Sequence, residues 1–263
     1  MKRTFVTAVL VLAAAVSAFA DVTIKSATAG KGLGMSAGTT STMYIKGMKM
    51  RTDSVAGEST RTMIYDVDEQ KMYMFDSKKK EADVFDMQAF GAEIAKSVQP
   101  GEMKASVKAN GQTKPISGKT ATGYDMEISV PTVIGGGDNG MKLTVMLTGP
   151  LWIVKGAPGT ADYMTFYKGA IDKGFFFSDP RAAKSSPGQA KAMAEMYRQL
   201  AQTGGVPYET EMNIKMGGEG PMAGMMAKMG GVSMTSVVQS VETETLPAAL
   251  FAPPADYKIT VKK

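Results

Sequence analysis

The chain has 263 residues, of which 44% are hydrophobic and 21% are charged, and its formal net charge is +5. This composition excludes a disordered or fibrous protein and fits one large or two small globular domains. Cysteine and histidine are both absent, which excludes disulfides, thiolate and imidazole metal sites, cysteine nucleophiles and the commonest general base. Because 23 methionines and 29 glycines accompany so few catalytic side chains, we expect a binding protein rather than an enzyme.

Residues 1–20 have the pattern of a secretory signal peptide. A basic pair opens them, residues 5–16 are almost entirely apolar, and Ala-Phe-Ala at 18–20 is a small-residue cleavage site. The apolar run is too short for a comfortable membrane span, although an uncleaved anchor or a buried N-terminal helix is the alternative. We expect cleavage before Asp21, a periplasmic location, and one mature domain over residues 21–263.

The first part of the mature chain has the pattern of an antiparallel meander. Its short apolar segments are separated by Gly, Asp, Ser or Lys, as in consecutive hairpins. The predicted strands cover residues 22–27, 42–45, 49–53, 61–66, 71–76 and 81–85, with a bend or bulge at Gly47 and a turn at residues 78–80. A helix is predicted over residues 87–98, where apolar residues recur at helical spacing before Pro100.

The second part of the mature chain alternates strands and helices. Strands are predicted at residues 104–108, 118–130, 141–154, 207–216 and 233–244, and helices at residues 161–171 and from Ser186 to just before Gly204. Each helix has one predicted apolar face: Tyr163, Phe166, Tyr167 and Ala170 on the first, and Met193, Met196, Tyr197, Leu200 and Ala201 on the second. The last strand, Tyr257 to Val261, is expected to pair antiparallel, with Phe251 buried as its anchor. This order of elements predicts an α+β fold with helices packed on one face of a large antiparallel sheet.

Two catalytic or cofactor-binding motifs match the sequence but lack the structural context that their function requires. Residues 135–140 satisfy G-x-G-x-x-G, but a strand-like run follows them where dinucleotide binding requires a helix. Ser77 and Lys80 have the spacing of a serine–lysine acyl-enzyme pair, but they lie in an exposed turn. Cleavage of the signal peptide removes two positive charges and lowers the net charge from +5 to +3, which is too small to imply a nucleic-acid partner. We therefore expect no catalytic residue, no cofactor and no bound nucleic acid.

Methionine is concentrated in two regions, residues 35–74 and residues 212–234. Core filling is one interpretation, and a pliable apolar cavity is another, because methionine adapts to irregular apolar surroundings. The candidates for lining such a cavity are Met43, Met63, Met72, Met74, Trp152, Met193 and Met196. A third interpretation is a copper(I) site built from thioethers, for which the candidates are Met222, Met225, Met226 and Met229.

Three further features resemble a known family. They are a strand that opens directly after the signal peptide, the series GKTATGY at 118–124 leading to LWIV at 151–154 and Pro-Gly at 158–159, and the tail LFAPPADYK at 250–258. Together they resemble the DUF4412 family of periplasmic proteins, which is similar to the LolA, LolB and RseB class of lipoprotein carriers and sensors. The resemblance implies a curved antiparallel sheet, an incomplete β-barrel, with helices covering its open face and an apolar concave face that receives acyl chains.

These observations lead to two classes of function. The first is a periplasmic carrier or envelope sensor that binds a lipid-like ligand or the acyl chains of a lipoprotein and associates with the outer membrane. The second is a module without transport, either a methionine-based copper(I) binder or a structural envelope protein with a fully packed core. A cavity lined by methionine and aromatic side chains would favour the first class, whereas a core without a cavity would favour a structural role.

The signal peptide predicts the N-terminus of the exported protein. N-terminal sequencing of periplasmic material should begin Asp-Val-Thr-Ile-Lys, because signal peptidase cleaves after small residues such as those at 18–20. Retention of Met1 in a cytoplasmic fraction would contradict both the cleavage site and the location.

Overall fold

The computed structural model describes residues 21–31, 38–97, 103–134, 141–175, 177, 179–181, 187–218 and 231–262. Residues 1–20, which carry the predicted signal peptide, lie outside this part of the chain. Within the described ranges, no helix has both the length and the apolar character that crossing a membrane requires.

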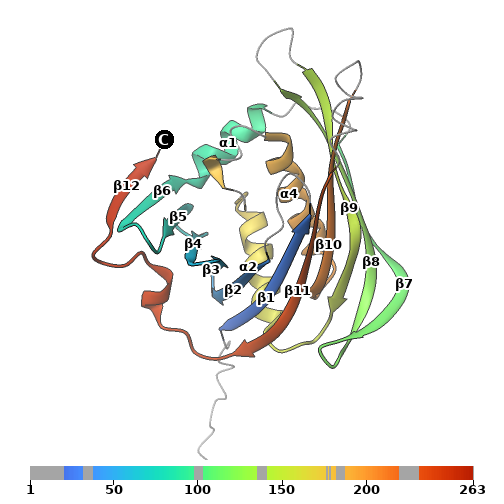
Figure 1. Cartoon of the computed structure of the whole chain (residues 1–263), viewed down its shortest axis with the longest axis horizontal. Coiled ribbons are helices and arrows are strands. Elements are labelled where there is room, and N and C mark those ends of the chain that lie inside the picture. The colour runs from blue at the N-terminus through green and yellow to red at the C-terminus, as the bar shows by residue number, and fades with distance from the viewer. Residues whose placement is uncertain are drawn as a thin grey trace, which may run out of the picture.

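Twelve strands of the described chain join into one strongly curved sheet that does not close (Figure 1). Their order across the sheet is β12-β6-β5-β4-β3-β2-β1-β11-β10-β9-β8-β7. In chain order they are β1 (Val22–Lys31), β2 (Thr39–Lys46), β3 (Lys49–Ala56), β4 (Ser59–Asp66), β5 (Lys71–Asp76), β6 (Glu81–Asp86), β7 (Lys104–Ile116), β8 (Lys119–Ile134), β9 (Met141–Val154), β10 (Val206–Gly218), β11 (Val232–Thr243) and β12 (Lys258–Lys262). The predicted α+β fold built on a large curved sheet is confirmed.

The pattern of side chains along the strands matches this sheet. In β5, Met72 and Met74 are buried in the main core and Phe75 is buried in a separate cluster, so this strand is apolar on both faces. The turn between β2 and β3 contains Gly47, whose φ is +55°, a left-handed conformation that glycine adopts without strain. Gly47 therefore makes a tight hairpin turn, where the sequence predicted a bend or bulge.

Three helices of the described chain lie inside the curve of the sheet (Figure 1). They are α1 (Met87–Ser97), α2 (Thr160–Asp172) and α4 (Pro187–Leu200). α4 packs on β7, β8 and β9, whereas α1 packs on β5 and β6. α2 buries Tyr163, Phe166, Tyr167 and Ala170, which is the helix face that the sequence predicted. The helices therefore cover the concave face of the sheet.

The position of α2 depends on the glycine that precedes it. Gly159 has a φ of 73°, and a Cβ atom added there would lie 2.3 Å from Cγ2 of Val22. Any other residue would strain the backbone and push the start of α2 away from β1. Gly159 thus allows the helix to begin in direct contact with the first strand.

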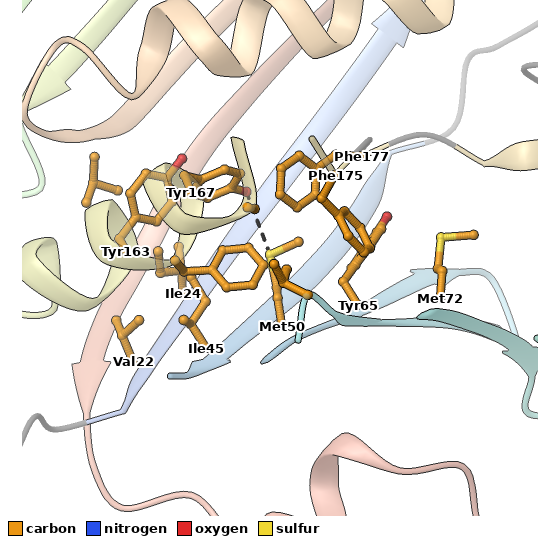
Figure 2. Packing of buried hydrophobic residues seen from close by; sticks show 14 of the residues in the cluster. Val22, Ile24, Ile45, Met50, Tyr65, Met72, Tyr163, Tyr167, Phe175 and Phe177 are labelled. Carbon is orange, nitrogen blue, oxygen red and sulfur yellow. Dashed lines mark hydrogen bonds between the residues drawn. The ribbon is translucent and has the colours of Figure 1, made fainter. Parts of the chain in front are cut away.

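The main core lies between α2 and the concave face of β1, β2 and β3 (Figure 2). Tyr163 and Tyr167 of α2 lie over Val22 and Ile45 of the sheet. The Tyr167 hydroxyl donates to the sulfur of Met50 over 3.7 Å. This contact joins the helix to the third strand and places the phenols of α2 in the interior.

The C-terminal tail covers the outer face of the sheet. It includes a short 3-10 helix, η1 (Ala248–Phe251). Leu246 and Phe251 of the tail are buried in one cluster with Ile64, Phe75 and Ala82 of β4, β5 and β6. Burial of Phe251, whose exposed fraction is 4%, is therefore confirmed.

The last strand pairs in the direction opposite to the prediction. β12 runs parallel to β6, whereas the sequence predicted antiparallel pairing for residues 257–261. β6 and β12 are not consecutive in the chain, so their relative direction is set by the path of the tail and not by a local turn. Residues 244–257 follow β11 and cross the outer face before the chain joins the edge of the sheet beside β6 (Figure 1).

Replacing Phe251 by alanine should lower the free energy of unfolding by about 3–5 kcal/mol, because the truncated side chain leaves a cavity under the tail. Urea denaturation with the midpoint and slope both fitted measures this change. Val261→Ala, at a side chain that is 74% exposed, is the control and should change the free energy by less than about 0.5 kcal/mol. An unchanged midpoint for Phe251→Ala would show that the tail does not pack as described.

Candidate ligand-binding cavity

An apolar cavity of ≈290 Å³ lies between the helices and the concave face of the sheet. α2 and α4 form one wall, and β1, β2, β10 and β11 form the other. The described side chains that line it are Thr28, Met43, Tyr163, Tyr167, Met193, Met196, Tyr197, Leu200, Pro207, Thr210, Met212, Met234 and Ser236. Five methionines and three tyrosines supply most of this lining, and none of these residues carries a charge at neutral pH.

The helical wall follows from the spacing of residues along α2 and α4. Met193, Met196 and Leu200 recur at spacings of three and four residues and therefore share one face of α4. The ring of Tyr197 on α4 stacks on that of Tyr167 on α2, with 5.3 Å between the centroids and 14° between the planes. This stacked pair joins the two helices beside the cavity.

The sheet wall follows from the register of its strands, because residues directly opposite each other in an antiparallel pair share one face. Met212 on β10 is opposite Met234 on β11, so two methionines lie side by side. Two positions along β11, Ser236 is opposite both Thr210 on β10 and Thr28 on β1. The Thr28 hydroxyl donates to the Ser236 oxygen over 3.1 Å. These three residues, Thr28, Ser236 and Thr210, form a row of hydroxyls across three neighbouring strands, which we call the hydroxyl row.

The ionisable groups that line the cavity are phenols. Burial raises the pKa of Tyr163, Tyr167 and Tyr197 above its ordinary value, because a phenolate would lose its hydration in the protein interior. The neighbouring phenol of Tyr163 raises the pKa of Tyr167 further. All three side chains are therefore neutral at physiological pH, and the cavity presents apolar surface and uncharged hydroxyls.

The structure brings three of the seven predicted residues together. Met43 from β2 and Met193 and Met196 from α4 all line the cavity. Met212 and Met234 were not among the predicted lining residues, although both lie in a methionine-rich region. The predicted strands 207–216 and 233–244 could have indicated them, but only the register of β10 and β11 places the two residues opposite each other.

Three other predicted methionines lie outside the cavity lining. Met72 is fully buried in the main core, and Met63 packs against that core from β4. Met74 accepts a hydrogen bond from the Arg61 guanidinium over 2.9 Å. These side chains fill the core and its rim, which is the first of the interpretations that the methionine content allowed.

Trp152 lies on the face of the sheet that points away from the cavity. It is opposite Glu209 on β10, whereas the cavity-lining Thr210 is opposite Leu151. The ammonium group of Lys114 lies 4.2 Å from the centre of the indole ring and pairs with Glu209 over 2.8 Å. Trp152 is half-buried and also packs against the main hydrophobic cluster, and strand alternation places it on the face opposite to Leu151, outside the cavity lining.

Two further groups of predicted residues are the copper candidates and the tyrosines of the helix faces. The copper candidates Met222, Met225, Met226 and Met229 lie outside the described residues. Tyr163, Tyr167 and Tyr197 were predicted only as members of apolar helix faces. Periodicity finds such faces, but it does not tell whether a ring meets another side chain or a cavity.

A larger hollow of ≈410 Å³ lies at the rim near β4, β5, β6 and β12. Charged side chains dominate it: Arg61 pairs with Asp179, and Asp83 lies 3.7 Å from Arg181 and 3.2 Å from Lys262. These opposite charges satisfy one another as an ion-pair network. We therefore assign the candidate site to the apolar cavity.

Comparisons with known proteins give a distant likeness. No family model matches this chain, and no curated protein matches it, so membership of the DUF4412 family stays a prediction. Among solved structures, it is similar to the crystal structure of a putative outer membrane lipoprotein-sorting protein domain from Vibrio parahaemolyticus. That likeness covers 89% of each chain at 8% identity, with a TM-score of 0.31. The function proposed below rests on the cavity and not on this likeness.

Burial of the cavity tyrosines predicts a loss of stability at alkaline pH. Because folding raises the pKa of Tyr163 above its unfolded value of about 10, the stability that this group contributes is complete below about pH 10 and is lost at higher pH. The free energy of unfolding should therefore fall above about pH 10, and Tyr163→Phe should reduce the fall. Urea denaturation at each pH measures it, and a fall that is the same in the variant would contradict the burial of this phenol.

Proposed function

We propose that this protein is a periplasmic carrier or envelope sensor that binds the acyl chains of a lipid or lipoprotein and performs no catalysis. The observation that carries this proposal is the apolar cavity between α2, α4 and the concave face of the sheet, lined by five methionines and three tyrosines. Ligand sites are concave, mostly apolar and few per protein. An apolar pocket of ≈290 Å³ that opens to solvent between the helices and the sheet therefore favours a ligand-binding role over a purely structural one.

The methionines suit a ligand of variable length. A methionine side chain is unbranched, rotates about three bonds and carries a polarisable sulfur, so it can re-pack around different apolar surfaces. Met43, Met212 and Met234 come from the sheet, whereas Met193 and Met196 come from α4. Soft side chains on both walls allow the cavity to change shape with little strain.

The energy of burying an acyl chain is large enough for useful affinity. Each buried methylene contributes about 0.8 kcal/mol, so about six methylenes contribute about 5 kcal/mol. This offsets the lower end of the association cost, about 4–15 kcal/mol, and each further buried methylene adds net affinity. The volume of the cavity, ≈290 Å³, lies just below the range for ligand sites, about 300–1,000 Å³.

The chemistry of the lining supports binding without catalysis. The lining side chains within the described chain include no carboxylate, ammonium or guanidinium group, and burial raises the pKa of the three phenols. An acyl chain needs none of these groups, because the hydrophobic effect supplies its affinity. The periplasmic location is supported by the pattern of residues 1–20, and we propose that the protein meets its lipid or lipoprotein partners at the outer membrane.

A neutral fluorescent probe tests the proposal. Phenylnaphthylamine, which brightens in apolar surroundings, should bind the mature protein saturably and be displaced by phospholipid. Met193→Lys should weaken probe binding about ten-fold or more, because the ammonium group must be desolvated or must block the cavity. Met164→Lys on α2 is the matched control, since Met164 is also half-buried but does not line the cavity, and it should keep the wild-type affinity.

Two results would contradict the carrier proposal. The first is a folded protein that binds neither the probe nor phospholipid, which would favour a structural role. The second is the same absence together with stoichiometric binding of copper(I), which would favour the methionine-based alternative. Thermal denaturation of each variant shows whether it is folded before its affinity is compared.

A further inference from the structure

The polar residues of the cavity indicate which chemical group the bound acyl chain is attached to. From the hydroxyl row and the uncharged lining, we infer that the cavity selects acyl chains attached through a neutral ester or amide and discriminates against free fatty-acid carboxylates. This inference rests on the proposed function, which concerns the apolar chain alone.

The hydroxyl row offers hydrogen-bond donors that the protein does not use. A serine or threonine hydroxyl has one hydrogen to donate and two lone pairs to accept with. Thr28 uses its hydrogen on the Ser236 oxygen, at 3.1 Å, so Ser236 keeps its own hydrogen. Among the described residues, neither Ser236 nor Thr210 has a hydrogen-bond acceptor for its hydroxyl.

The two free donors lie close enough to serve one ligand group. Ser236 and Thr210 are directly opposite each other on β11 and β10, which puts their Cβ atoms about 5 Å apart. Both line the cavity and are half-buried. A bare apolar chain that displaces water from these hydroxyls would leave them without an acceptor, which costs free energy. A ligand that brings a carbonyl oxygen to this point avoids that cost and so gains affinity over one that does not.

The uncharged cavity disfavours an ionised carboxylate. A fatty acid whose carboxyl group has an ordinary pKa, about 4–5, is ionised at neutral pH. Moving that charge into the cavity without a cation is costly, and the lining has no lysine or arginine in the described chain. The titratable groups facing this point are Tyr163, Tyr167 and Tyr197, and these neutral phenols do not supply a counter-charge.

The test compares ligands that share one acyl chain. Dodecanoate, methyl dodecanoate and monododecanoylglycerol are each used to displace phenylnaphthylamine from the mature protein, at about pH 7 and about pH 5. At about pH 7 both esters should bind at least about ten-fold more tightly than the acid. The gap should narrow at about pH 5, because more of the acid is protonated, whereas the affinities of the esters should not change.

Two variants locate the preference on the hydroxyl row. Ser236→Ala removes one free donor and should weaken ester binding about three- to ten-fold. Thr235→Ala is the control, because Thr235 is the next residue on β11 and is opposite Glu211, on the other face of the sheet. It should leave ester binding unchanged.

The outcomes separate the inference from the function on which it rests. If the free acid binds as tightly as the esters at about pH 7, or if Ser236→Ala binds esters like wild type, the inference is wrong and the acyl carrier stands. If none of the three ligands displaces the probe while phospholipid does, the neutral-head inference is again overturned. If neither they nor phospholipid binds, the proposed function itself is wrong.

Discussion

The aromatic cluster around Phe177 holds the helices against the concave face of the sheet. The centroid of the Phe177 ring lies 5.1–5.7 Å from those of Tyr65 on β4, Phe166 and Tyr167 on α2, Phe175, and Tyr197 on α4. Figure 2 shows Phe177 beside Phe175 and Tyr65. Offset and edge-to-face pairs each contribute about 0.5–1.5 kcal/mol beyond the burial of their area. Because one ring contacts both helices and the sheet, this cluster sets the distance between the two walls of the cavity.

The concave face changes character along β1, which leaves room for the cavity. On β1 the large side chains of Val22 and Ile24 fill the space under α2, whereas further along the same face Ser26 and Thr28 are small. Ser26 and Ser41 satisfy each other across β1 and β2, with 3.0 Å between their oxygens. The helices are held at the distance that the large residues require, so space remains where the small residues face α4. That space has soft methionine walls and a polar row at one position, which is the arrangement an amphipathic ligand needs.

Asp21, just before β1, joins the start of the sheet to the segment that follows β11. The carboxylate of Asp21 accepts hydrogen bonds from the Lys46 ammonium over 2.6 Å and from the backbone N–H of Leu246 over 2.8 Å. Asp21 is almost completely buried, and a buried carboxylate requires such partners. This contact directs the chain after β11 towards the outer face, where Phe251 is buried and β12 reaches the edge beside β6.

The sequence by itself determined the strands, the helices and their apolar faces, because these depend on side-chain periodicity over neighbouring residues. It also indicated a binding protein, since no histidine or cysteine is present. Only the tertiary structure decided that β12 runs parallel to β6, because the direction in which two distant strands pair depends on the path of the chain between them. It alone also decided which way Trp152 points, because a strand that is apolar on both faces carries no sign of which face is inside. The hydroxyl row joins Thr28 to Ser236 across 208 positions of the chain, and such a pairing is set by strand register and not by local pattern. The cavity, finally, depends on the distance at which the packed aromatic rings hold α2 and α4 from the sheet. That distance cannot be read from the sequence of any single segment.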